Sequence, residues 1–377
     1  IGKESLYSNT SGYENNAHGF KALYSNTSGN FNSANGVNAL YSNTTGDNNL
    51  ASGWSALYSN TIGNFNAAIG MGALYSNTTG NINTATGSGA LYTNTSGSGN
   101  TVNGTYAVYN NTTGNNNTVT GYNALFTNST GSFNTVNGME ALYSNTTGFS
   151  NVANGVRALY LNSDKSNLVA LGDSSLYNNG TDATTFYHAS GNTALGSKSL
   201  YTNTTGYYST AIGYRSLYLN ITGYYNTANG YKSLYSNTQG YANTAIGNEA
   251  LYSNTTGYTN TSVGLQSLYT NTIGYSNTAT GNKALYSNIS GNFNTVNGFN
   301  ALYSNTLGNT NTAMGYEALR NNVVGYSNIA IGANALWINQ NRSNLVAVGD
   351  SSLYKNGANS TLIYHATNNT ALGSKTL

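Results

Sequence analysis

The sequence contains no cysteine and no proline, and charged residues make up only 6% of its 377 residues, against about 25% in ordinary soluble domains. Without cysteine the chain can form no disulfide framework, no thiolate metal site and no cysteine nucleophile. The net charge is +2 and no basic run occurs, which argues against nucleic acid as a partner. No apolar run approaches the ~20 residues of a membrane-spanning helix, so we expect no membrane span in this segment.

Carboxylates are also scarce, since aspartate and glutamate together number only 10. Hydrolytic enzymes that act on sugars need paired carboxylates, and the sequence shows no phosphate-binding loop and no zinc-ligand spacing. Its three histidines and many serines form no convincing Ser-His-Asp arrangement. We therefore predict that the protein is not an enzyme and has no catalytic, cofactor-binding or metal-binding residues.

What the sequence has in abundance is an internal repeat, marked by the dipeptide Leu-Tyr. The marker position recurs at a constant spacing from Tyr7 and Tyr24 onward, except for one longer step from Tyr177 to Tyr201, and it is tyrosine in every rung but those of Phe126, Arg320 and Trp337. The consensus repeat, or rung, reads A-L-Y-S-N-T-T-G-x-x-N-T-A-x-G-x-x. The segment 158–200 closely matches the segment 335–377. The chain therefore holds about two copies of a 177-residue super-repeat, with long rungs at about 177–200 and 354–377.

Seventeen residues are too few for a pair of helices but can hold two short strands and two turns. We expect one strand on A-L-Y-S and the other on N-T-A, with glycines in the turns. Rungs stacked in register, ~4.8 Å apart, give an all-β parallel β-solenoid roughly 100 Å long. No break in composition divides residues 1–377, so we expect a single continuous solenoid. Because the chain starts in mid-repeat at Ile1, we expect it to be a segment of a longer protein.

The alternation of side chains along each rung predicts which of them face inward. The nearly constant leucine, such as Leu23, and the small residue of N-T-A, such as Ala34, should fill the core. Two asparagines per rung, represented by Asn26 and Asn32, should stack on their equivalents and form amide ladders. We interpret the many Asn-x-Ser/Thr sequons as parts of these ladders rather than as glycosylation sites.

The same alternation turns the marker tyrosines and the residue after the small core residue outward. That second position is often apolar, as in Ile69, Ile246 and Met314. A continuous row of such side chains would be an unusually large apolar surface for a soluble monomer. We therefore expect these rows to be buried against partner chains in an obligate oligomer.

Three segments resemble the head repeats of trimeric autotransporter adhesins, and similar repeats occur in bacteriophage tail fibres. They are T-A-I-G-Y-R-S-L at 210–217, L-V-A-L-G-D-S-S-L at 168–176 and T-A-L-G-S-K-S-L at 193–200. The resemblance implies a left-handed β-roll, three chains around a common axis and a surface-exposed adhesive or spacer role. The 17-residue rung and the constant tyrosine depart from the usual 14-residue pattern of those heads.

The long rungs are the candidate contact sites, because the plain rungs are nearly interchangeable. Each long rung has seven extra residues, and aromatic or apolar side chains on a protruding loop are typical of contact hot spots. The candidate residues are Phe186, Tyr187 and His188 in one loop and Ile363, Tyr364 and His365 in the other. The alternative is that each loop clamps the next chain of the trimer. Nearby, equivalent pairs (Lys165 with Asp173, Arg342 with Asp350) predict a repeated ion pair or turn cap.

Together these patterns favour a structural and adhesive extracellular fibre segment, a rigid spacer with contact loops. Its partners would be copies of itself in a homotrimer or between fibres, and a surface receptor or glycan. We expect it at a cell surface or a virion surface. Two alternatives stay open: a bacteriophage tail-fibre shaft, and an ice-binding solenoid, for which Thr84-Ala85-Thr86 and Thr118-Val119-Thr120 have the appropriate Thr-x-Thr pattern.

Overall fold

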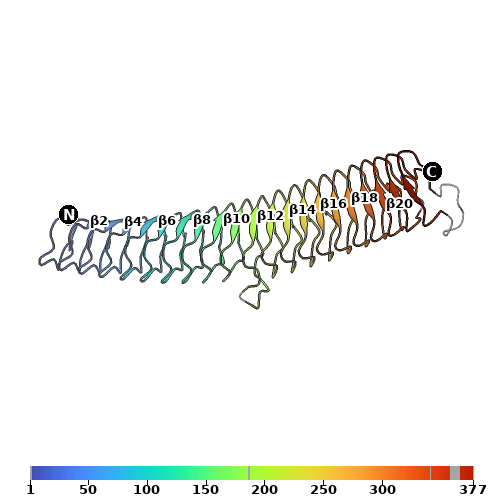
Figure 1. Cartoon of the computed structure of the whole chain (residues 1–377). Coiled ribbons are helices and arrows are strands. Elements are labelled where there is room, and N and C mark those ends of the chain that lie inside the picture. Colours follow the sequence, from blue (N-terminus) through green and yellow to red (C-terminus); the bar gives the residue numbers. More distant parts are fainter. Residues whose placement is uncertain (1, 186, 340, 357–365, 377) are drawn as a thin grey trace. The chain divides into compact units, whose positions relative to one another are not determined.

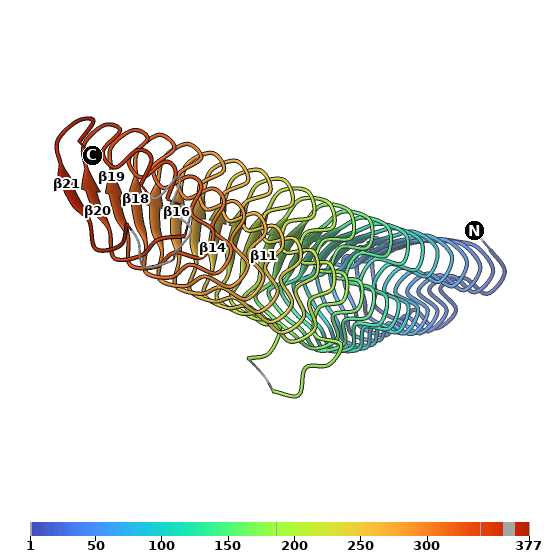
Figure 2. The same cartoon turned by 90° about the vertical axis from the view of Figure 1, so that its right-hand side faces the viewer.

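The computed structural model of the chain describes residues 2–185, 187–339, 341–356 and 366–376. Two compact units divide the chain, one ending at residue 191 and the other beginning at residue 192. Each unit is a parallel β-solenoid, drawn as a series of similar turns with one short strand in each (Figures 1 and 2). No described residue lies in a helix. The predicted all-β parallel solenoid is therefore confirmed.

Each rung contributes one strand of three residues. The strands of the first unit are β1 (Asn16–His18), β2 (Ser33–Asn35), β3 (Leu50–Ser52), β4 (Ala67–Ile69), β5 (Thr84–Thr86), β6 (Thr101–Asn103), β7 (Thr118–Thr120), β8 (Thr135–Asn137), β9 (Val152–Asn154) and β10 (Val169–Leu171). Those of the second are β11 (Thr193–Leu195), β12 (Thr210–Ile212), β13 (Thr227–Asn229), β14 (Thr244–Ile246), β15 (Thr261–Val263), β16 (Thr278–Thr280), β17 (Thr295–Asn297), β18 (Thr312–Met314), β19 (Ile329–Ile331), β20 (Val346–Val348) and β21 (Thr370–Leu372).

Within each unit, successive strands pair in parallel with equivalent residues side by side. In the first unit Ala34 of β2 pairs with Ala51 of β3, its equivalent in the next plain rung. At the end of the second unit Ala347 of β20 pairs with Ala371 of β21, its equivalent across a long rung. The strand register therefore continues unchanged across this long rung.

The core of each unit consists of small and branched apolar side chains. Leu23 and Ala34 are both buried, as are nearly all of their described equivalents along the units, which confirms the predicted facing. The residue before the leucine is buried as well, for example Ala22. Where serine replaces that alanine, its hydroxyl bonds locally, as Ser175 Oγ does to the Gly172 carbonyl at 2.9 Å. The core is thin but is continuous from rung to rung.

The two predicted asparagine ladders are present and buried. Asn43 Nδ2 donates to Asn26 Oδ1 of the preceding rung at 2.8 Å and to the Gly46 carbonyl at 3.0 Å. In the second ladder, Asn49 donates its backbone N–H to Asn32 Oδ1 at 3.0 Å and its Nδ2 to the Gly63 carbonyl at 2.8 Å. Buried amides must be hydrogen-bonded to be tolerated, and stacking each on its equivalent achieves this at almost every rung.

The second strand predicted on A-L-Y-S is wrong, because this segment forms turns. The core leucine has a positive φ, 52° at Leu40, and so does the residue two before it, 57° at Asn38. This left-handed conformation reverses the direction of successive peptide groups and is incompatible with an extended strand. The segment still binds the next rung, since the Leu40 N–H donates to the Ala56 carbonyl at 3.0 Å.

The glycine of the T-T-G segment, which we call the turn glycine, is required by close approach between rungs. A Cβ built on Gly46 would lie 2.5 Å from the Gly63 carbonyl oxygen and 2.5 Å from Asn43 Oδ1. Such contacts are too short for any side chain unless the next rung moves. A lysine or arginine at this position therefore needs space that a regular next rung does not leave.

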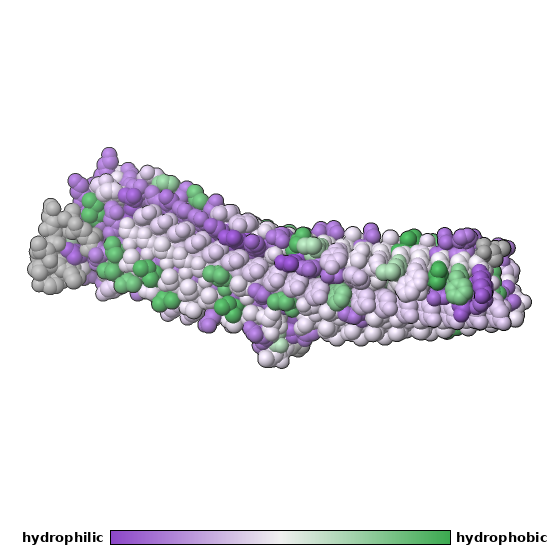
Figure 3. All heavy atoms as spheres, turned by 180° about the vertical axis from the view of Figure 1, so that it is seen from behind, coloured by the Kyte–Doolittle hydropathy of each residue, from purple (hydrophilic) through white to green (hydrophobic). Residues whose placement is uncertain are grey.

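The marker tyrosines are half-buried in a ladder of stacked rings rather than freely exposed. Tyr24 and Tyr41 are stacked with centroids 5.1 Å apart and an angle of 4° between the ring planes. A second ladder runs from Tyr207 to Tyr275 in the second unit, with neighbouring centroids 4.7–5.0 Å apart. On the face drawn in Figure 3, apolar residues form separate patches instead of one band. The expected continuous apolar surface is therefore interrupted, while the predicted oligomer stays a prediction.

The tyrosine ladders predict a loss of stability in alkali. Burial raises the pKa of Tyr269 and Tyr286, and Glu249 and the neighbouring phenols raise it further. Because the folded pKa lies above the ordinary value of about 10, the neutral ladder contributes its full stability below pH ~10 and loses it as the pH rises through the folded pKa. We expect a melting temperature that is constant from pH ~7 to ~9 and falls above pH ~10, measured by circular dichroism.

A matched variant checks the cause. Phenylalanine fits the ladder, since Phe126 stacks on Tyr143 at 5.2 Å. Replacing Tyr269 and Tyr286 together by phenylalanine should make the alkaline fall in melting temperature smaller. An identical fall in the variant and the parent would show that other groups cause it.

Candidate functional site

The first long rung leaves the stack between Gly180 and His188. Asn179 Nδ2 donates to the Ala189 carbonyl at 2.9 Å, as Asn162 does to the Lys165 carbonyl at 3.0 Å in the rung before. Ala189 therefore stands where a plain rung has its turn glycine. Of the seven extra residues, 181–187, the described ones (181–185 and 187) belong to the loop that projects from the side of the first unit in Figures 1 and 2. We call this loop the insert.

The second long rung closes in the same way. Asn356 Nδ2 donates to the Ala366 carbonyl at 2.8 Å, and Ala366 has the place in the second super-repeat that Ala189 has in the first. The equivalent loop residues Ile363, Tyr364 and His365 lie outside the described residues, as does Phe186 of the first insert. The two described candidates are therefore Tyr187 and His188.

Tyr187 and His188 lie side by side where the insert rejoins the stack. Their ring centroids are 4.9 Å apart and the ring planes are at 82°, an edge-to-face contact. Tyr187 is 41% exposed, while His188 is half-buried. An exposed aromatic ring held by a neighbouring ring is suited to contact with another surface. Whether it makes such a contact stays a prediction.

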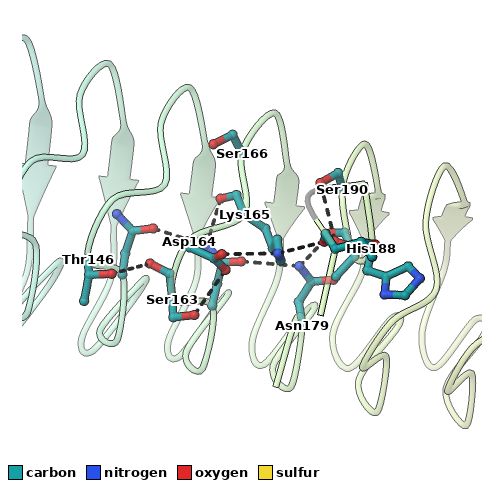
Figure 4. Close-up of polar contacts among 12 residues, drawn as sticks. Thr146, Ser163, Asp164, Lys165, Ser166, Asn179, His188 and Ser190 are labelled. Atoms are coloured by element: carbon teal, nitrogen blue, oxygen red, sulfur yellow. Dashed lines mark hydrogen bonds and ion pairs between the residues drawn. The ribbon is translucent and has the colours of Figure 1, made fainter. Parts of the chain in front are cut away.

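Lys165 anchors the insert, a role that the sequence analysis missed. It replaces the turn glycine in the rung before the insert, and its side chain is only 4% exposed. Figure 4 shows it reaching toward the loop, where its ammonium donates to the Thr185 carbonyl at 3.1 Å and pairs with Asp164 at 3.2 Å. The insert gives this side chain the space that a regular next rung would occupy. Arg342 replaces the turn glycine before the second insert and is also buried.

The predicted ion pair between Lys165 and Asp173 is wrong. The carboxylate next to Lys165 is that of Asp164, its neighbour in sequence. Asp173 instead accepts a hydrogen bond from the Ser174 hydroxyl at 3.2 Å, and Asp350 does the same with Ser351 at 3.3 Å. Both aspartates therefore make the same local contact with the serine that follows them, and the turn-cap interpretation stays a prediction.

The insert and Lys165 should depend on each other. Deleting residues 181–187 joins Gly180 to His188 and restores a 17-residue rung. The Lys165 side chain then collides with the backbone carbonyl of that rung, because a side chain at any turn-glycine position lies too close to the next rung. We expect this deletion alone to lower the stability by about 1–3 kcal/mol, a typical value for overpacking. Adding Lys165→Gly should recover most of that loss. Thermal unfolding that is unchanged by the deletion alone would contradict the anchoring role.

A second surface feature concentrates the charges of the chain. The residue two before each core leucine carries seven of the 12 lysines and arginines and four of the five glutamates. We call this line of positions the charged row. In the second unit it consists of Lys198, Arg215, Lys232, Glu249, Gln266, Lys283, Asn300, Glu317, Asn334, Ser351 and Lys375. The concentration was visible in the sequence once residues were sorted by rung position, but the sequence analysis did not do so.

Cations of the charged row lie against the tyrosines of the first ladder. The Arg215 guanidinium is 5.3 Å from the ring centre of Tyr218, and the Lys232 ammonium is 5.8 Å from that of Tyr235. Both distances are within the range of cation–π attraction. A hydrogen bond with Tyr231 raises the pKa of Lys232. The aromatic faces therefore partly compensate a run of three cations on consecutive rungs.

A scan against protein-family models finds no match, and a search of curated proteins finds no significant similarity. The likeness to adhesin and tail-fibre repeats thus stays a resemblance. Within the described residues, no group of three or more His, Asp or Glu could hold a metal ion. The part of the chain that the structure describes also contains no helix long and apolar enough to cross a membrane.

Proposed function

We propose that this chain is a segment of a structural and adhesive extracellular fibre, in which plain rungs form a spacer and inserts make contacts. One observation carries the proposal: the same rung recurs with the same side chains in the same places, and only the long rungs interrupt it. Such a repeat supplies length and stiffness, which suits a spacer.

Self-association forms part of the proposal. Exposed apolar side chains such as Ile69, Ile246 and Met314 lie on the outer face of the strands. They are interrupted by polar rungs, so they would match a second copy only at a fixed register. We expect three chains per particle by light scattering at micromolar concentration, unchanged by a chelator. A stable monomer would contradict this part of the proposal.

Adhesion is tested with beads that carry the purified chain. We expect them to be retained on glass coated with mixed cell-surface glycans more strongly than beads that carry albumin. The variant that combines the deletion of 181–187 with Lys165→Gly is the matched control for the insert, because it should stay folded. Retention no greater than that of albumin beads would contradict an adhesive role.

Ice binding is a second candidate, favoured by one stretch of the first unit. In β6, β7 and β8 both outward positions are exposed and occupied by threonine or asparagine. Paired in register, they form an array with spacings of ~4.8 Å between rungs and ~6.6 Å along a strand. Thermal hysteresis that is lost on replacing Thr118 and Thr120 by tyrosine would support this candidate, and an absence of hysteresis in the parent would exclude it.

A further inference from the structure

The charged row of the second unit borders a hollow of about 270 Å³. It lies beside the rungs of β16, β17 and β18, in the segments that follow these strands. Its lining includes Asn282, Lys283, Phe299, Asn300, Tyr303 and Arg320. The hollow lies wholly within the second unit and shares no residue with either insert.

Two amide oxygens in the hollow have no hydrogen-bond donor. Asn300 is only 9% exposed, and its Nδ2 lies 3.5 Å from Glu317 Oε1, while its Oδ1 is buried without a partner. Asn282 Oδ1, from the preceding rung, is also buried without a partner. A buried acceptor left unsatisfied is destabilising. Most asparagines at fixed rung positions satisfy each other, so these two side chains form a polar wall of the hollow whose hydrogen bonding the repeat does not complete.

The hollow also has an uncompensated positive charge. Arg320 is balanced by Glu317, with Nε 3.4 Å from Oε1, and Glu317 in turn accepts the Trp337 indole N–H at 2.9 Å. Lys283 makes no ion pair with any described residue, and its ammonium lies 5.9 Å from the ring centre of Tyr286. The hollow therefore favours a ligand that carries one negative charge near Lys283.

An aromatic face completes the lining. Phe299 is 42% exposed and is stacked on Tyr316 of the next rung, with centroids 5.5 Å apart. Stacking on Tyr316 fixes the orientation of the Phe299 ring. A ligand can therefore pack on one face of this ring without a further loss of side-chain entropy. The C–H face of a pyranose packs well against such a ring. The combination of acceptors, a cation and an aromatic face differs from an apolar protein-docking groove.

We propose that this hollow binds an acidic sugar residue, a pyranose that carries a carboxylate, within a surface glycan. The carboxylate accepts hydrogen bonds from Lys283, sugar hydroxyls lie against the polar wall that Asn282 and Asn300 form, and the ring packs on Phe299. The inference rests on the proposed adhesive function, for which it names the class of ligand.

A hollow in the first unit provides an internal comparison. It measures about 230 Å³ and lies where Gly72 and Gly89 occupy the charged row. Trp54 and Tyr106 are among its walls, and it contains no charged side chain. It lacks the cation that a carboxylate requires, so it should not select acidic sugars.

The test is a titration of the full chain with a glucuronic acid oligosaccharide and with its neutral glucose counterpart, followed by calorimetry and NMR. We expect binding of the acidic oligosaccharide alone, weakened on the order of tenfold by Lys283→Met, in line with the loss of one charge-assisted hydrogen bond. Lys21→Met is the matched control: it removes a lysine from the same rung position, where Glu4 is its partner at 3.6 Å. Trp54→Ala controls for the other hollow.

Equal affinity in Lys283→Met and the parent, or equal affinity for the neutral oligosaccharide, would overturn the inference. Equal weakening by Lys21→Met would also overturn it, because the effect would then be one of overall charge. The result of the sugar titration can be distinguished from the result of the bead adhesion test. Beads that adhere without binding acidic sugar would overturn only this site, and sugar binding without adhesion would overturn only the adhesive function.

Discussion

Each side chain in these units lies one rung away from its own equivalent, ~4.8 Å along the stack. This spacing favours residue types whose side chain is attracted to an identical side chain in the next rung. Amides do so by donating to the preceding amide, as Asn43 does to Asn26, and phenols do so by stacking, as Tyr24 does on Tyr41. Like charges repel each other at this spacing, which is consistent with the small share of charged residues in the chain.

The charged row shows how the constraint is met where charge is present. Opposite charges occupy successive rungs at Glu140 and Arg157, 2.7 Å apart. Where three cations follow one another, aromatic faces take the place of acids, as Tyr218 does for Arg215. The first insert follows the same logic, since Lys165, a buried cation in place of a turn glycine, lies beside a rung that leaves the stack.

Much of the fold could be predicted from the sequence, because the repeat fixes what must stack on what. The constant rung length indicated the parallel register, and the constant Leu23 and Ala34 positions indicated the core. The left-handed conformation of Leu40 could not be predicted, because a leucine in a strand and one in this turn leave the same pattern. The anchoring by Lys165 depends on the distance between turn glycines and neighbouring carbonyls, which only coordinates give. The hollow beside Lys283 likewise depends on which amide oxygens lack donors.

The most direct test of in-register stacking compares two deletions in the second unit by thermal unfolding. Removing residues 236–252 takes out one whole rung and joins Tyr235 to Ser253, so every ladder stays in phase. Removing 236–251 takes out one residue fewer and shifts all later side chains by one position. We predict that the first variant keeps the circular dichroism spectrum of the parent and melts within a few degrees of it, whereas the second loses cooperative unfolding of this unit. Equal stability of the two variants would contradict the account.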